Sequence, residues 1–529
     1  MLLCDYPAQV LIEPHELEAL VYEAYRSKCV HGSAFCGRVC RRPECVKLAG
    51  EGRHKFPLKG HPGATNKVNI RFTDAWSDAV RHDHAFCESI EHISWVFSDL
   101  YDDQATGLLM YALALRANMQ RGAWVAAQLV RDPAAAKALT TVLKALGLSG
   151  TRLGALLCEA NTLVGRGAAP CDLDKEARYR GDAAAVEACT ARFYDPEALR
   201  SVIQRILAIE LRDREVVFDS LEEFWSKRWL WCVNGSHSRI RERETGQYRL
   251  EIPGQLHRRV FVENVKDEPV SQWDGVSYYS CSEKLEHGKG RALFAGDSVS
   301  YVAFEHLLRS VEQAWIGRKV ILDPGRAGHY GIVRRLRRLA ERSGINLMLD
   351  YDDFNSQHTL LAQKLVIEET GRHVHYPPHL LERLVSSYDN GVIVRGQHKY
   401  KVKGTLMSGH RGTTFVNSVL NLAYLELACP GLLELPSMHV GDDVYVACSS
   451  HKEAASILEA VGKTDLRMNP MKQSMGGHTA EFLRVATGPE YSIGYLARSI
   501  AGCVSGNWVR DTKLDRMEAL RSMVQTHPT

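Results

Sequence analysis

Apolar residues alternate on both sides of a short polar turn in the last quarter of the chain. Residues 438–446 read MHVGDDVYV, so strand-like apolar positions flank Gly441, Asp442 and Asp443. Glycine eases the backbone conformation that a two-residue hairpin turn requires. The pattern predicts a β-hairpin that presents the two aspartates at its tip. Because adjacent carboxylates repel, such a tip favours neutralisation by hard divalent cations, which prefer oxygen ligands.

A second carboxylate cluster lies about ninety residues upstream, where an apolar run over 345–350 ends at Asp350. This pattern is typical of a buried strand that releases a carboxylate at its C-terminal end, and the residues after 357 have helical spacing. Placed beside the hairpin tip, Asp350 would complete a site for two metal ions about 3.5–4 Å apart, as in phosphoryl transfer. The alternative is that polar residues of the intervening loop only cap the next helix, namely Asp352, Asp353 and Asn355.

The sequence between the two clusters, SGHRGTTFVNS, begins at Ser408 and contains Gly409 and Gly412. The glycines predict a flexible loop, and the apolar run that follows predicts a helix. A loop at a helix N-terminus offers backbone N–H groups to an anion. Thr413 and Asn417 are four residues apart, so they share a helix face and can direct polar groups at one ligand. The alternative is ordinary helix capping by Ser408 or Thr413.

A basic segment over 284–294 reads KLEHGKGRALF and contains two glycines. Lys284, Lys289 and Arg291 suit an extended arm that grips a triphosphate, because arginine supplies planar, bidentate hydrogen bonds. Scattered basic residues usually form a solvated surface, so this segment gains weight only from the carboxylate clusters that accompany it.

Taken in order, these segments resemble the motifs of viral RNA-dependent RNA polymerases. The motif sequences most resemble those of the totivirus group of double-stranded RNA viruses, and within this group those of the victoriviruses. The resemblance extends over roughly residues 226–510. Its motifs are F at 284–289, A at 349–358, B at 408–417, C at 439–443, D at 469–473 and E at 480–484. The tail at 494–498 and 505–508 also resembles the family, and residues 231–237 resemble a loop that guides the template.

The resemblance implies an α+β, right-hand polymerase fold, in which a palm of antiparallel strands packs on helices. Alanine- and leucine-rich stretches from about residue 74 predict a helix-rich N-terminal half. Residues 1–225 are expected to form an extension that braces fingers and thumb. The fingers would comprise 226–343 and 360–407, and the palm would comprise 344–359 and 408–486. Residues 487–529 would begin a short or truncated thumb.

The resemblance also assigns roles around the expected palm. Asp350 and Asp442 would be metal ligands, with Asp443 as an auxiliary, and would hold two Mg²⁺ or Mn²⁺ ions. One ion would activate the 3′-hydroxyl, and the other would stabilise the leaving pyrophosphate. Lys472 would be the general acid for pyrophosphate, and Arg484 would contact RNA.

A further set of residues would bind the incoming nucleotide. Lys284, Lys289 and Arg291 would hold the triphosphate, and Asn355 would read the ribose. Ser408, Thr413 and Asn417 would belong to the same sugar-selecting network, and Gly409 completes the nucleotide-binding set.

The implied function is an RNA-directed RNA polymerase that copies and transcribes a viral RNA genome by two-metal nucleotidyl transfer. Its partners would be RNA template, product duplex, ribonucleoside triphosphates and a viral capsid protein, inside the virion or in the host cytoplasm. One alternative is a catalytically silent RNA-binding packaging protein, which predicts damaged carboxylates, whereas all three are present. A second alternative is a reverse transcriptase. That family usually has aromatic residues where Val440 and Asn355 stand here, so both positions favour the use of ribonucleotides.

Composition adds few constraints. With 529 residues, 45% hydrophobic and 24% charged, the chain is an ordinary globular protein of several subdomains, and its net charge of +3 does not indicate nucleic-acid binding. No apolar run or leader predicts a membrane segment or secretion, so the 14 cysteines are expected as thiols. One cluster suggests zinc, although its spacing matches no standard finger: Cys29, His31, Cys36, Cys40 and Cys45.

Overall fold

The computed structural model describes residues 13–27, 68–83, 97, 100–119, 121–166, 170–232, 235–254, 256–325, 328–470, 472–477, 479–488 and 491–506. The candidate zinc cluster lies outside these ranges. Helices occupy the described part of the chain up to β1 (Ser236–His237), and strands and helices mix after it. The predicted α+β class and the helix-rich N-terminal half are therefore confirmed. None of the helices described here is long and apolar enough to span a membrane.

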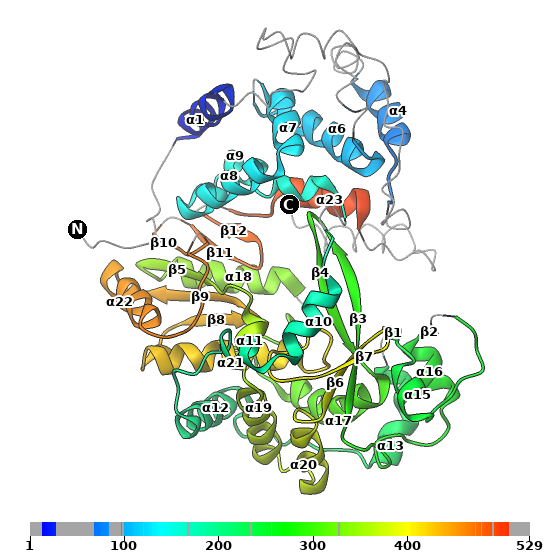
Figure 1. Cartoon of the computed structure of the whole chain (residues 1–529). Helices are drawn as coiled ribbons and strands as arrows, with labels where there is room; N and C mark the ends of the chain where they lie inside the picture. Colours follow the sequence, from blue (N-terminus) through cyan, green and yellow to red (C-terminus); the bar gives the residue numbers. More distant parts are fainter. Residues whose placement is uncertain are drawn as a thin grey trace.

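A four-stranded antiparallel sheet lies at mid-height on the left of the view in Figure 1. Its strands follow the order β10-β5-β9-β8, and their bounds are Ser474–Gly476, Ile345–Asp350, Asp443–Cys448 and Ser437–Val440. This sheet corresponds to the palm of antiparallel strands expected from the sequence.

Both faces of this sheet are buried. Leu347 and Leu349 pack in a core with helices α21 (Thr413–Ala428) and α22 (His451–Gly462). On the other face, Met348 packs with helix α18 (Gly328–Ala340). Because both faces are covered, β5 is an apolar run instead of an alternating pattern. Helices α12 (Pro196–Leu211) and α19 (Leu360–His373) pack behind α21 in the first core.

A second sheet carries the basic segment. Its order is β4-β3-β6-β7, with bounds Lys289–Gly296, Ser277–Glu286, Gly391–Arg395 and His398–Lys401. Strands β3 and β4 form a long antiparallel hairpin, and β3 pairs with β6 in parallel. Figure 1 shows this hairpin rising from the lower part of the molecule toward the N-terminal helices. The predicted extended arm is thus a β-hairpin.

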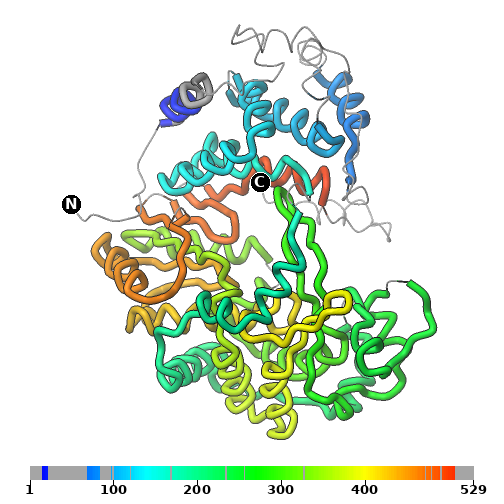
Figure 2. Tube along the Cα trace, in the orientation of Figure 1, coloured from blue at the N-terminus to red at the C-terminus, as the bar shows by residue number. Residues whose placement is uncertain are grey.

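The N-terminal helices and the last described helix share one core. Tyr495, Ile500 and Val504, in or next to α23 (Leu496–Ser505), pack among the N-terminal helices. Figure 2 shows these two distant parts of the chain, cyan and red, side by side. The N-terminal helices of this core are α6 (Asp102–Arg116), α7 (Gly122–Arg131), α8 (Pro133–Ala145) and α9 (Arg152–Leu157).

The remaining elements connect these units. The helices are α1 (Pro14–Ser27), α4 (Phe72–His82), α10 (Leu173–Gly181), α11 (Ala183–Glu187), α13 (Leu221–Ser226), α14 (Arg228–Trp231), α15 (Ile240–Thr245), α16 (Arg258–Asn264), α17 (Ser298–Ala314) and α20 (Pro378–Ser386). The strands are β2 (Leu256–His257), β11 (Ala480–Phe482), β12 (Val485–Thr487) and β13 (Ser492–Ile493). Short 3₁₀ turns occupy Leu148–Gly150, Ala160–Val164, Phe354–Gln357 and Leu432–Glu434.

Candidate active site

Three carboxylates meet where β5 ends and the β8–β9 hairpin turns. Val440 pairs with Asp443 across that hairpin, so its two-residue turn consists of Gly441, with φ of 60°, and Asp442. Positive φ at the first turn position alone is the type II′ geometry, which glycine favours. Asp350 is the cross-strand neighbour of Asp443. The predicted hairpin, and the convergence of its tip with the end of the upstream strand, are both present in the structure.

The carboxylates interact electrostatically. Burial, together with the charges of Asp442 and Asp350, raises the pKa of Asp443 to about 7. Burial also raises the pKa of Asp350, against the opposing effect of Lys472. Negative charge is therefore concentrated at this edge of the sheet, and a cation would relieve the repulsion.

The segment before β10 holds Asp350 in place. Lys472 Nζ donates to Asp350 Oδ1 at 2.8 Å. The side chain of Gln473 binds both backbone groups of Asp350: its Nε2 donates to Asp350 O at 2.6 Å, and its Oε1 accepts from Asp350 N at 3.1 Å. The structure thus brings Lys472, predicted from a different motif, to the carboxylates.

The donor set suits a hard divalent cation, since carboxylate oxygens are the ligands that Mg²⁺ prefers. In the described ranges, however, no three acidic, histidine or cysteine side chains form a preformed metal cluster. The ammonium group of Lys472 already neutralises one oxygen of Asp350. A divalent cation bound by Asp350, Asp442 and Asp443 would therefore exchange with, or share Asp350 with, this ammonium group.

A buried polar network lies beside the carboxylates. Asn417 Nδ2 donates to Asn355 Oδ1 at 2.7 Å, and His358 Nε2 donates to Asn417 Oδ1 at 2.8 Å. Burial lowers the pKa of His358 to about 4, so the ring is neutral and fixes the Asn417 amide. Sequence reasoning had placed Asn355 and Asn417 in one network but missed His358, although it belongs to the same segment as Asp350.

The loop before α21, residues 408–412, is bonded to the basic hairpin. Ser408 Oγ accepts from Phe294 N at 3.2 Å, and Gly409 N donates to Phe294 O at 3.0 Å. The Thr413 hydroxyl donates to His410 O at 2.7 Å, so it faces this loop and not the Asn417 network. The expectation that Thr413 and Asn417 address one ligand is not met in this conformation.

Neither helix is capped as the alternatives proposed. The N-cap of α21 is Gly412, without a side-chain cap. The N-cap of α19 is Thr359, whose hydroxyl accepts from Ala362 N. Capping of α19 by Asp352, Asp353 or Asn355, and of α21 by Ser408 or Thr413, is therefore wrong.

A basic pocket of about 480 Å³ adjoins the carboxylates. Only Glu159 and Glu286 are acidic among its charged lining residues. The basic lining residues come from the β3–β4 hairpin, the segments around β10 and β11, helix α8, the segment after the 3₁₀ turn at Ala160–Val164, and α23: Lys137, Lys144, Arg166, Lys284, Lys289, Arg291, Lys472, Arg484 and Arg498. The structure thus unites all three predicted triphosphate ligands with Lys472 and Arg484.

Four members of this pocket were missed by sequence reasoning, namely Lys137, Lys144, Arg166 and Arg498. For the two lysines, the signal was a polar stripe at helical spacing on the otherwise apolar α8: Lys137, Thr140, Thr141 and Lys144.

Within the pocket, the cations are unequally neutralised. Lys284 and Arg291 both pair with Glu286, at 2.9 and 3.2 Å. No carboxylate of the described residues lies within ion-pair distance of Lys289 Nζ. Burial lowers the pKa of Lys289, and the charges of Arg291, Lys472 and Lys137 lower it further, whereas the charge of Glu286 opposes this fall. A polyanion in the pocket would relieve this repulsion.

Arg484 approaches the carboxylates from the β11–β12 turn. Leu483 and Arg484 have φ of 50° and 66°, which makes a tight turn between the two strands. The charge of Arg484 opposes the rise in the pKa of Asp443, so the two groups interact. The predicted RNA contact is thus adjacent to the carboxylate site.

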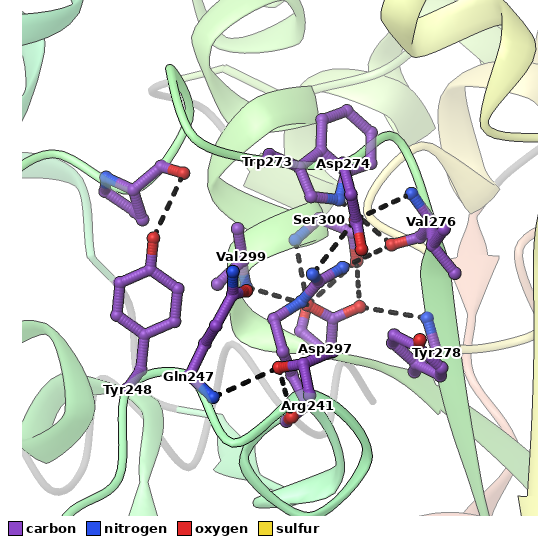
Figure 3. A network of polar contacts seen from close by, with 12 residues as sticks. Arg241, Gln247, Tyr248, Trp273, Asp274, Val276, Tyr278, Asp297, Val299 and Ser300 are labelled. Atoms are coloured by element: carbon purple, nitrogen blue, oxygen red, sulfur yellow. Dashed lines mark hydrogen bonds and ion pairs between the residues drawn. The ribbon is translucent and has the colours of Figure 1, made fainter.

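The base of the β3–β4 hairpin is fixed by a buried ion pair (Figure 3). Asp297 Oδ1 accepts from Arg241 Nε and from the first N–H groups of α17, all at 3.0 Å. Its Oδ2 accepts from Tyr278 N at 3.0 Å. Arg241 also donates to Asp274 and to Val276 O. One carboxylate therefore joins α15, α17 and β3.

The tip of the same hairpin is also held. Gly288 N donates to Gly165 O at 2.8 Å, and Arg166 Nη1 donates to Leu285 O at 2.8 Å. His287 Nε2 lies 3.1 Å from Ser505 Oγ at the end of α23. With both ends anchored, the hairpin forms a rigid wall of the basic pocket.

An antiparallel palm sheet with carboxylates at a strand end and a hairpin tip, faced by a basic hairpin, defines a right-hand polymerase fold. The chain belongs to the viral RNA-directed RNA-polymerase family, whose model matches residues 46–508.

Two curated relatives are named "Probable RNA-directed RNA polymerase". The protein of Leishmania RNA virus 1 - 1 is 40% identical and covers 89% of this chain and 54% of its own length. The protein of Helminthosporium victoriae virus-190S is 37% identical, and the match covers 99% of this chain and 64% of that protein. This chain therefore spans about half to two thirds of the length of these relatives. The solved RNA-dependent RNA polymerase of a human picorbirnavirus, an insertion-loop deletion mutant, matches with a TM-score of 0.49, 13% identity, and coverage of 73% of this chain and 80% of that one.

Proposed function

We propose that this chain is the catalytic part of an RNA-directed RNA polymerase that joins ribonucleotides on an RNA template. The observation that carries the proposal is the meeting of Asp350, Asp442 and Asp443 with a pocket rich in cations. Carboxylates for cations and cations for a triphosphate are the two halves of a nucleotidyl-transfer site. Membership of the viral polymerase family supports the same activity.

In this proposal the pocket holds the triphosphate through Lys289, with Lys284 and Arg291 beside it. Among these three hairpin cations Lys289 is the natural first contact, because Lys284 and Arg291 both pair with Glu286 while no carboxylate of the described residues forms an ion pair with Lys289. Lys472 Nζ, between the Asp350 carboxylate and the pocket, would donate a proton to the departing pyrophosphate. Positioning and charge stabilisation then supply most of the rate enhancement.

The sugar would be read by the Asn355–Asn417 pair. His358 fixes the Asn417 amide, which in turn orients Asn355 through its Oδ1. A site that hydrogen-bonds a sugar hydroxyl discriminates strongly against the analogue that lacks it. Ribonucleotides are therefore expected to be preferred over deoxyribonucleotides, and equal use of the two would contradict this assignment.

Asp350 and Asp442, with Asp443 as an auxiliary, would hold two Mg²⁺ or Mn²⁺ ions. When bound, such ions activate the attacking 3′-hydroxyl and stabilise the leaving pyrophosphate.

Replacing Lys289 with methionine is expected to raise KM for nucleotide roughly tenfold to a hundredfold with a smaller change in kcat, because a hydrogen bond to a charged group contributes about 1.5–3 kcal/mol. Steady-state incorporation at varied nucleotide concentration measures this. Lys399→Met is the control, since Lys399 lies in the same sheet but pairs with Glu244 at 2.6 Å. Equal KM values for both variants would remove Lys289 from the triphosphate site.

Replacing Gly409 with alanine is expected to lower kcat/KM on the order of a hundredfold, since misplacement by about 1 Å near the chemistry has effects of that size. A Cβ at this position would lie 2.6 Å from Phe294 O and 2.7 Å from Ala295 Cα, so backbone must move. Gly412→Ala is the control, because its Cβ would meet only movable side chains, nearest Leu308 Cδ1 at 3.2 Å. Full activity of the Gly409 variant would show that the loop position is not critical.

The wider setting follows from the relatives, which come from viruses. We propose that the chain works on RNA template and product duplex, beside a viral capsid protein, inside the virion or in the host cytoplasm. The expected fingers, palm and thumb boundaries belong to the same proposal. Co-sedimentation of the chain with capsid protein from the same virus would test the partnership.

A further inference from the structure

A second pocket, of about 600 Å³, lies beside the loop at residues 408–412. The loop contributes Gly409, His410 and Arg411 to its wall. Helices α14, α16 and α17 also contribute to the wall, among other residues through Trp231, Arg258 and Tyr301. The pocket therefore shares this loop with α21, the helix that carries Asn417.

Arg258 is an anomaly in this pocket. Its guanidinium lies over the Tyr301 ring, with Cζ 3.6 Å from the ring centroid. Its Nε is buried and has no hydrogen-bond partner. Among the described residues, no carboxylate is within ion-pair distance of it. Burial accordingly lowers the pKa of Arg258. A half-buried guanidinium without an anionic partner is costly unless a ligand supplies the anion.

The acidic residues of the pocket do not fill this role. Arg411 binds both Glu305 and Glu312, the latter at 2.6 Å. Arg309 lies 3.9 Å from Glu305 as a second cation. The remaining acid, Asp323, is exposed. The two glutamates are thus committed to Arg411, and Arg258 stays available.

The backbone beside Arg258 leaves room for its guanidinium. A Cβ added to Gly235 would lie 2.9 Å from Arg258 Nη1 and 3.2 Å from its Cζ. Arg258 N also donates to Gly235 O, which fixes the two segments together. Glycine at 235 therefore lets the guanidinium lie flat between the backbone and Tyr301.

We propose that Arg258 binds a phosphodiester of the single-stranded RNA template where the template passes the loop at 408–412. A stacked guanidinium presents planar donors that match a phosphate, and Tyr301 holds its plane. Such a contact positions the strand without reading its sequence. The inference rests on the proposed function, because it assigns a template contact to that polymerase.

The test is binding of a fluorescent single-stranded RNA to the whole chain, without divalent cations, at several salt concentrations. Arg258→Met is expected to weaken binding roughly threefold to tenfold and to reduce the salt slope by about 0.7, the value for one phosphate of a single strand. Arg258→Lys should recover the slope but only part of the affinity. Arg259→Met is the matched control, since Arg259 is the next residue of α16 and lies 3.5 Å from Glu263; it should match the wild type.

Two further measurements protect the test against a misfolded variant. Gly235→Ala should weaken RNA binding while Arg258 itself is unchanged, because the new methyl group displaces the guanidinium. In the wild-type protein, RNA carrying 5-iodouridine should crosslink to Tyr301.

Wild-type affinity and slope in folded Arg258→Met, or crosslinks confined to other regions, would overturn the inference. The proposed function would still stand if the wild type incorporates nucleotides. Absence of RNA binding by the wild type would remove both proposals.

Discussion

Replacing Asp442 with alanine is expected to reduce nucleotide incorporation on the order of a thousandfold or more, while the protein stays folded. Asp442 is exposed in the turn after Gly441, so its side chain supports little packing. Its carboxylate is one of three that would hold the divalent cations, and loss of a group that stabilises the transition state has effects of this size. Single-nucleotide incorporation and thermal unfolding of the same preparation measure the two halves of the prediction.

The control for this variant is Asp389→Ala, which removes an exposed carboxylate paired with Lys364 at the surface. It should keep wild-type activity. Normal extension by the Asp442 variant would reject the carboxylate site, whereas loss of activity together with a lowered unfolding temperature would assign a structural role to the turn.

Replacing Arg241 with methionine is expected to lower the free energy of unfolding by about 3–5 kcal/mol, because it leaves the buried Asp297 carboxylate without its cation. Asp297 is 1% exposed, and it joins α15, α17 and the start of β3. Urea denaturation with an unchanged m-value measures the loss. Since the basic hairpin is anchored there, KM for nucleotide should rise as well.

Arg243→Met is the control for this second variant. Arg243 is on the same helix but exposed, so its removal should change stability by less than about 0.5 kcal/mol. Equal stability of the two variants would show that the Arg241–Asp297 pair does not anchor the hairpin.

The centre of the fold was predictable because its signals are local. The apolar run ending at Asp350 and the alternation around Gly441 both formed strands, and a turn of two residues fixes its own register. The predicted family and α+β class are confirmed. The roles of Asp350, Asp442 and Lys472 stay predictions, although the structure brings the three together.

The rest of the site depends on contacts between distant segments, which no local pattern encodes. Lys137 reaches the pocket only because α8 packs against the 3₁₀ turn at Ala160–Val164 and against the edge strand β10. The partnership of Glu305 with Arg411 likewise joins residues more than a hundred positions apart. The capping alternative is wrong for a simpler reason: Thr359, directly before α19, caps this helix in place of Asp352, Asp353 or Asn355.

The most direct test of the proposed polymerase is incorporation of labelled ribonucleotides by the purified chain with Mg²⁺ or Mn²⁺ on defined RNA templates. The account predicts that a poly(C) template directs incorporation of GMP and a poly(U) template that of AMP, with no product from either when template or divalent cation is omitted. Bound RNA without incorporation on any template would contradict catalysis by this chain and would support a silent, RNA-binding polymerase fold.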